Sequence, residues 1–93
     1  MKKSINAWTF EGKVPYAEAA RRAKAAGFEA IEPTVELEGE LTVTSNEADC
    51  RRLAEQIRGA GLEIASLACG LFWQASYTSN DAADREKAKA WTR

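Results

Sequence analysis

The chain has 93 residues, of which 45% are hydrophobic and 29% are charged, and its formal net charge at pH 7 is −1. This composition is typical of one small globular domain spanning residues 1–93, and it gives no electrostatic basis for binding nucleic acid or an anionic membrane. No apolar run approaches the roughly 20 residues of a membrane span, so we expect neither nucleic acid nor membrane as a partner. The chain has no histidine, which removes the most common general base and transition-metal ligand.

The amino terminus and the two cysteines bear on the compartment. Met1-Lys2-Lys3 is not followed by the apolar region of a secretory signal, so the sequence predicts a cytoplasmic protein. Cys50 and Cys69 are not in a metal-binding or redox spacing. We expect both thiols to be reduced and buried rather than joined in a disulfide, as is usual in the cytoplasm.

The first unit is a strand followed by a helix. Residues 4–8 are predicted to form a strand in which Asn6 and Trp8 share one face. After a loop, Pro15 suits the first position of a helix, which is predicted over residues 15–26. Its apolar face consists largely of small residues, which would let the helix approach a sheet closely. These residues are Ala19, Ala20 and Ala23.

The second strand is predicted within residues 27–34 and ends with a carboxylate. Gly27 suits the left-handed position that terminates the preceding helix. Pro33 cannot donate a ladder hydrogen bond, so the strand should stop there and leave Glu32 at its carboxyl end. Ligands of α/β sheets bind at that end of the strands. The alternative is that Glu32 is a solvated strand-end residue or pairs with a nearby arginine.

A loop and a second helix follow. Residues 35–43 are predicted to form a loop, although their alternation also permits a small hairpin around Glu38-Gly39. We interpret its three glutamates as a solvated face and not as a metal site; they are Glu36, Glu38 and Glu40. Residues 44–47, Thr-Ser-Asn-Glu, match a capping box, so a helix should run to about Ala60 and end at Gly61. Its predicted apolar face contains Cys50, Leu53, Ala54 and Ile57.

The third unit repeats the second. Residues 62–69 form an almost continuous apolar run, which is typical of a parallel strand covered on both faces. An aromatic loop over 70–77 and a second capping pattern at 78–81 precede a helix predicted over 82–93. The two capping patterns, like Gly27 and Gly61, are 34 residues apart. This period indicates successive βα units.

The predicted fold class is therefore α/β, with three parallel βα units in sequential order and the helices on one face. Such a sheet leaves its other face bare and two edges open, and a closed (βα)8 TIM barrel, which typically needs about 250 residues, removes both problems. The bare face would carry Asn6, Trp8, Ala30 and Glu32. We expect a partial barrel completed by self-association. The alternative is a self-sufficient domain whose own loops cover the second face.

Three stretches of the chain support a family resemblance. They are residues 5–8, residues 25–32 (AAGFEAIE) and residues 60–67 (AGLEIASL). Together they resemble the amino-terminal part of the sugar phosphate isomerase/epimerase family, the xylose-isomerase-like barrels. The resemblance implies an enzyme with one divalent metal, often manganese, and two glutamates that transfer protons beside a sugar carbonyl. It places most of these groups on later strands, so no cofactor is expected in this chain itself.

The resemblance also implies the positions of substrate-binding residues. Glu32 would bind a substrate hydroxyl and not the metal. The apolar side of the sugar pocket would be lined by Cys69, Gly70, Phe72 and Trp73, with Trp8 flanking it from the first strand. The alternative is that the aromatic residues after the third strand are loop anchors. No residue of this chain is expected to be catalytic.

Three functional hypotheses follow. The first is a truncated or engineered barrel fragment that assembles with copies of itself, most simply as a dimer, and has no catalytic activity of its own. The second is the amino-terminal part of a metal-dependent sugar (phosphate) isomerase or epimerase that forms the substrate-pocket wall and works only with a complementing chain. The third is a natural stand-alone binding module. Apart from a second copy of the chain, the ligand that the resemblance implies is a sugar.

Overall fold

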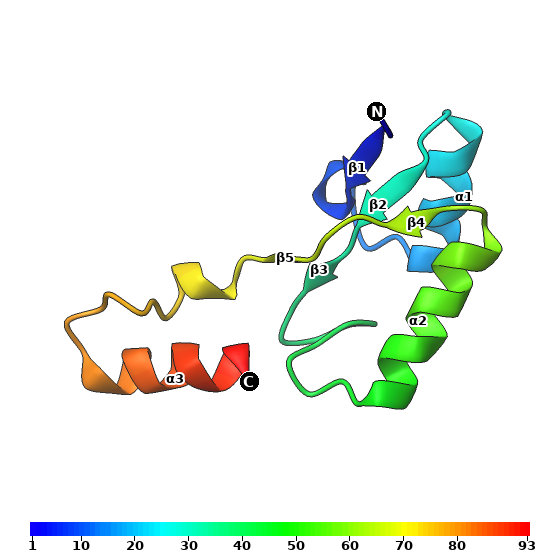
Figure 1. Ribbon diagram of the computed structural model, residues 1–93. Coiled ribbons are helices and arrows are strands. Elements are labelled where there is room, and N and C mark those ends of the chain that lie inside the picture. The colour runs from blue at the N-terminus through cyan, green and yellow to red at the C-terminus, as the bar shows by residue number, and fades with distance from the viewer.

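The computed structural model describes all 93 residues as a mixed α/β fold with parallel strands (Figure 1). One sheet has the order β1 (Ser4–Asn6), β2 (Ala30–Glu32) and β4 (Glu63–Ile64), and the second pairs β3 (Thr34–Val35) with β5 (Ala68–Cys69). The α-helices are α1 (Tyr16–Ala25), α2 (Glu47–Gly59) and α3 (Ala82–Thr92). Two short 3₁₀ helices are η1 (Ala7–Thr9) and η2 (Leu71–Trp73). The predicted α/β class and the sequential order of parallel strands are confirmed.

The predicted strands are shorter than the sequence suggested, and two of them are interrupted. The first ends at Asn6, whose side-chain Oδ1 accepts the Trp8 N–H at 2.7 Å and turns the chain into η1. Pro33, which has no N–H, separates β2 from β3. Pro33 can still accept, and its carbonyl receives the Ala68 N–H at 2.9 Å, so pairing resumes as the second sheet. The predicted third strand is thereby divided into β4 and β5.

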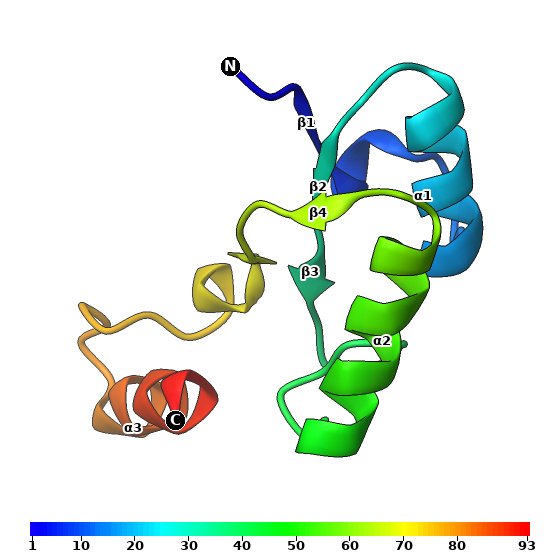
Figure 2. The ribbon, with the colours of Figure 1, turned by 45° about the vertical axis from the view of Figure 1, so that its right-hand side comes forward.

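Helices α1 and α2 cover one face of the three-stranded sheet (Figure 2). Ile5, Ile31 and Ile64 are neighbours in the parallel register, and Ile31 on the central strand is fully buried. The predicted alanine face of α1 is confirmed, since all three alanines are buried. On α2, Leu53 and Ile57 are buried as predicted. The core therefore lies between these two helices and the sheet.

Glycines terminate both of these helices. Gly27 has a φ of 92° and Gly61 a φ of 89°, which is the left-handed region that residues with a side chain rarely adopt. The Phe28 N–H then donates to the Ala23 carbonyl, and the Leu62 N–H donates to the Ile57 carbonyl. The 34-residue period thus corresponds to two equivalent helix-to-strand turns, as the sequence predicted.

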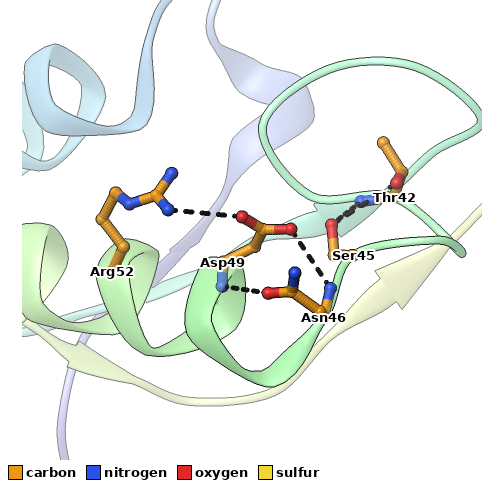
Figure 3. Close-up of polar contacts among 5 residues, drawn as sticks. All are labelled: Thr42, Ser45, Asn46, Asp49 and Arg52. Carbon is orange, nitrogen blue, oxygen red and sulfur yellow. Dashed lines mark hydrogen bonds and ion pairs between the residues drawn. The ribbon is translucent and has the colours of Figure 1, made fainter.

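The start of α2 differs from the predicted capping box by two residues. Asn46 is the N-cap: its Oδ1 accepts the Asp49 N–H at 2.8 Å, while the Asp49 carboxylate accepts the Asn46 N–H at 3.2 Å (Figure 3). Arg52 lies 3.4 Å from the same carboxylate. Ser45 is used by the preceding turn, where its Oγ accepts the Thr42 N–H at 2.9 Å. The hydroxyl groups of the predicted motif therefore close a turn instead of capping the helix.

The environment of the cysteines was predicted only in part. Both are free thiols, but Cys50 is exposed and Cys69 is half-buried. Cys50 is in the first turn of α2, which extends beyond the ends of β2 and β4 (Figure 1). The sheet therefore does not cover Cys50, although this residue shares its predicted helical face with Leu53.

Helix α3 does not join the layer formed by α1 and α2, contrary to the prediction that all helices share one face. Figures 1 and 2 both place it on the other side of the strands. Its one fully buried residue is Ala88, so it has little apolar surface to offer the main core. Its Trp91 instead packs edge-on against Phe72, which stacks on Tyr77. We call η2, α3 and the segment between them, residues 71–92, the α3 lobe.

This lobe makes the molecule elongated. The radius of gyration is 14.6 Å, whereas a compact domain of this length is expected to have one of about 12 Å. The principal extents are 45 × 26 × 26 Å. No helix of the structure combines the length and apolar character needed to cross a membrane.

The sheet face opposite α1 and α2 is only partly open. Asn6 and Glu32 are half-buried. Trp8, which the sequence placed on this face, lies beyond the strand in η1 and is 58% exposed. Ala30 is buried, contrary to the prediction. In the register, Ala30 of the central strand lies between Ser4 of β1 and Glu63 of β4. At this end of the sheet, the Lys2 Nζ lies 2.7 Å from the Glu63 carboxylate and so links the two outer strands.

The loop after β3 is not a hairpin. Glu36 forms an isolated parallel bridge with Thr42, and the Glu36 N–H donates to the Leu41 carbonyl at 3.0 Å. Leu41 is buried and belongs to the main core, so it anchors the loop to that core. Glu36, Glu38 and Glu40 are exposed, in agreement with the predicted solvated face.

Candidate functional site

Three polar side chains meet at the carboxyl ends of the three-stranded sheet. Asn6 ends β1, Glu32 ends β2, and Ser66 follows β4 by two residues. The Asn6 Nδ2 donates to Glu32 Oε1, and the Ser66 Oγ donates to Glu32 Oε2 at 2.5 Å. Glu32 makes no ion pair, so the alternative in which an arginine partners it is wrong. We call Asn6, Glu32 and Ser66 the strand-end triad.

The strand-end triad fixes the protonation of Glu32. The hydrogen bond from Ser66, and secondarily the one from Asn6, lower the pKa of the Glu32 carboxyl below its usual value. The carboxylate is therefore ionised at neutral pH, with lone pairs left to accept a further hydroxyl group. Such a group is suited to binding and orienting a polyol. It is not tuned as a general acid, which would need a raised pKa.

Trp8 and Gly70 join the same edge of the sheet. The Trp8 N–H is held by the Asn6 Oδ1, which places the tryptophan directly after the triad. A Cβ atom at Gly70 would lie 3.4 Å from Trp8 Cζ2, so the indole lies against the backbone there. The structure thus brings Trp8 against Gly70 and ties the Trp8 backbone to Asn6 of the triad.

The other three residues that were predicted to line the pocket do not gather at the strand-end triad. Cys69 is in β5 beside Val35 and is half-buried. Phe72 packs within the α3 lobe, with its ring centroid 5.4 Å from that of Tyr77. The Trp73 side chain is 93% exposed. The environment of Phe72 favours the loop-anchor interpretation for that residue.

Two members of the triad were not identified as site residues from the sequence. Asn6 was assigned only to the bare face, and Ser66 was not singled out. Ser66 follows Glu32 by 34 residues, which is the period of the βα units. The strands, however, pair Ala30 with Glu63 and Ile31 with Ile64, one residue short of that period, so the period alone did not indicate the contact.

Two adjoining clefts share several lining residues, and no member of the strand-end triad lines either of them. The larger, of about 580 Å³, lies between the segment around η1 and the loop after β3. The smaller, of about 450 Å³, extends from that loop to Gly70 and Gln74. Trp8 and Thr34 line both clefts, whereas Glu32 lines neither.

The residues at this edge do not fit the divalent metal that the resemblance implies for the whole family. Glu32 is the one carboxylate of the triad, and each of its oxygens already accepts a hydrogen bond. Nowhere in the structure do three or more histidine, cysteine, aspartate or glutamate residues gather as potential ligands. The groups at this edge can form hydrogen bonds and offer an aromatic surface for stacking.

Comparison with known proteins gave no match: no family model fits the chain, and no curated protein or solved structure matches it.

Proposed function

We propose that this chain forms one wall of a sugar-binding pocket, as the amino-terminal (βα)3 part of a barrel like those of the sugar isomerases and epimerases. The observation that carries the proposal is the strand-end triad at the carboxyl ends of three parallel strands. That end of a parallel sheet is where barrel enzymes bind substrate. The ionised Glu32 accepts a sugar hydroxyl, and Asn6 and Ser66 hold the carboxylate in place.

The neighbouring groups support the same role. Trp8, whose backbone N–H is bonded to Asn6 of the triad, offers an exposed aromatic surface, which suits the C–H face of a sugar ring. The outer edges of β1 and β4 pair with no other strand. In a closed barrel these edges join further strands, and those strands supply the remaining walls and the catalytic groups.

We expect monosaccharide binding to depend on the Glu32 carboxylate. In a ¹⁵N NMR titration with D-fructose and D-glucose, the Asn6 side-chain amide and the Trp8 indole should shift, with an affinity on the order of 10 mM for a single wall. Glu32→Gln should weaken binding about tenfold, because a hydrogen bond to an ionised acceptor is lost. The matched control is Glu63→Gln, which removes an exposed carboxylate from the opposite end of the same sheet. Equal affinities for all three proteins would contradict the proposal.

These 93 residues alone should not turn over a sugar, because the triad provides one carboxylate and the chain has no histidine. The assay is aldose–ketose isomerisation and ketose epimerisation by the purified chain with added Mn²⁺. Activity that a chelator abolishes would show that the chain is complete as a catalyst.

A second proposed function, self-assembly, is favoured by the surface that three large apolar residues outside the strands expose. Trp8, Leu67 and Trp73 are 58%, 62% and 93% exposed, respectively. Stable interfaces bury roughly 1,600 Å² in total. The burial of apolar surface contributes about 25 cal/mol per Å², and this gain would offset the free-energy cost of association. We propose that a second copy covers this surface in a two-fold dimer, the most common symmetry.

Sedimentation equilibrium at low micromolar concentration tests this assembly. We expect the mass of two chains for the unaltered protein and one chain for Leu67→Arg, which places a charge in the proposed interface. Leu67 is exposed, so this substitution should leave the fold intact, and far-UV circular dichroism serves as the check. A native-like monomer for the unaltered chain would refute the dimer and favour the self-sufficient domain.

A further inference from the structure

We propose that the sugar bound at the strand-end triad is unphosphorylated, so that this wall takes a neutral polyol and disfavours a sugar phosphate. This specificity rests on the sugar-binding function proposed above and adds the class of sugar to it. Helix amino termini commonly bind phosphate, because their first backbone N–H groups have no partner within the helix. The observations that carry the proposal are the groups that occupy the amino-terminal ends of α1 and α2.

These two helix ends lie toward the same edge of the sheet as the triad. Both helices run against the direction of the strands, so their first turns lie toward the carboxyl ends of the strands (Figure 1). A direct contact fixes the start of α1 there, because the Tyr16 hydroxyl accepts the Thr34 N–H at 2.8 Å. Thr34 follows Glu32 by two residues, which is at most about 7 Å of extended chain. A phosphate on a sugar held by Glu32 would therefore meet the field of this helix end.

The start of α1 is already bonded to a carboxylate of the chain. Its N-cap is Pro15, which has no backbone N–H to offer a ligand. The next N–H, that of Tyr16, donates to the Glu40 carboxylate at 2.7 Å. A carboxylate at this end of a helix interacts favourably with the helix dipole. Glu40 thus holds the position that a phosphate group would need.

The start of α2 is closed in the same sense by its capping box. The Asp49 N–H donates to the Asn46 side chain, and the Asn46 N–H donates to the Asp49 carboxylate. Glu47 adds a second carboxylate to the first turn. This helix end therefore also presents negative charge toward the carboxyl edge of the sheet.

The surrounding charges oppose a phosphate as well. The Glu32 carboxylate is ionised, since its two hydrogen bonds lower its pKa. The larger cleft is lined by one ammonium group, that of Lys13, and by three carboxylates, those of Glu36, Glu38 and Glu40. A phosphate monoester carries a charge of about −1.5 to −2 at pH 7, and like charges repel it. A neutral sugar has no such penalty.

The test compares D-fructose with D-fructose 6-phosphate in ¹⁵N NMR titrations that follow the Asn6 side-chain amide. We expect the phosphorylated sugar to bind at least about tenfold more weakly, and the difference to narrow at high ionic strength, because salt screens the repulsion. Inorganic phosphate, titrated alone, should cause no saturating shift of the Tyr16 backbone amide in the unaltered chain.

Glu40→Ala is the decisive variant, because it frees the Tyr16 N–H and removes one negative charge. Inorganic phosphate should then give a saturating shift at the Tyr16 amide, and the difference between the two sugars should narrow. The matched control is Glu38→Ala, which removes an exposed carboxylate of the same loop that does not cap the helix, and it should give no phosphate response at Tyr16. If circular dichroism shows that Glu40→Ala is unfolded, Glu40→Gln removes the charge, keeps an acceptor oxygen and should still narrow the difference.

The outcomes separate this specificity from the function on which it rests. If D-fructose binds and D-fructose 6-phosphate binds equally well or more tightly, the specificity is wrong and the sugar-binding wall stands. A phosphate response at Tyr16 in the unaltered chain, or the same response in Glu38→Ala as in folded Glu40→Ala, also overturns the specificity. If D-fructose itself causes no shift, the proposed function fails and the specificity fails with it.

Discussion

Replacing Leu53 with alanine should lower the free energy of unfolding by about 2–5 kcal/mol, the usual cost of removing a buried leucine side chain. Leu53 is 5% exposed and lies in the core between α2 and the sheet. A small domain has only about 5–15 kcal/mol of stability in total, so this variant should show a much lower urea midpoint. Its neighbour Ile57 is fully buried in the same core and limits how far the cavity can collapse.

The control for this experiment is Glu55→Ala on the same helix. Glu55 is exposed and alanine is an equally good helix former, so the urea midpoint should change little. If Leu53→Ala also left the midpoint unchanged, the face of α2 that contacts the sheet would have been misidentified.

Replacing Tyr16 with phenylalanine should cost about 1–3 kcal/mol, because a buried donor loses its partner. The Tyr16 hydroxyl accepts the Thr34 N–H at 2.8 Å, and Thr34 is buried. This contact joins the first turn of α1 to β3, just beyond the interruption at Pro33. Without it, the Thr34 N–H has no partner, in addition to the hydroxyl that already lacks one.

The matched control is Tyr77→Phe, which removes a hydroxyl that contacts Thr92 in an exposed setting. Water can replace that partner, so the loss should be a few tenths of a kcal/mol. Chemical denaturation of the two variants under identical conditions gives the comparison. Equal losses would mean that the Tyr16–Thr34 contact does not stabilise the fold.

Local patterns in the sequence were sufficient to predict the helices and the parallel order of the strands. The alanine face of α1, the apolar positions of α2 and the two terminating glycines all act within one or two helical turns. Glu32 could be placed at a strand end because Pro33 excludes a ladder donor. These features depend on spacing along the chain, and spacing is what a sequence shows directly.

Features that depend on contacts between distant residues could not be predicted in the same way. The hydrogen bond from Ser66 to Glu32 requires the register of two strands, and a shift of one residue would have turned Ser66 to the other face. The capping of α2 by Asn46 depended on whether the turn before it had already used Ser45. The exposure of Cys50 depended on how far α2 extends past the sheet.

The separate packing of the α3 lobe has a consequence for how the molecule opens. The main core joins α1, α2 and the sheet. The lobe relies on the aromatic contacts of Phe72 with Tyr77 and Trp91 and on a few buried residues, which are Leu71, Ala75 and Ala88. Regions with few buried apolar contacts open at lower free energy than the global transition. The lobe should therefore exchange its amide hydrogens by sub-global fluctuation, as a cooperative unit of its own, while the amides of β2 and α2 exchange only when the whole domain unfolds.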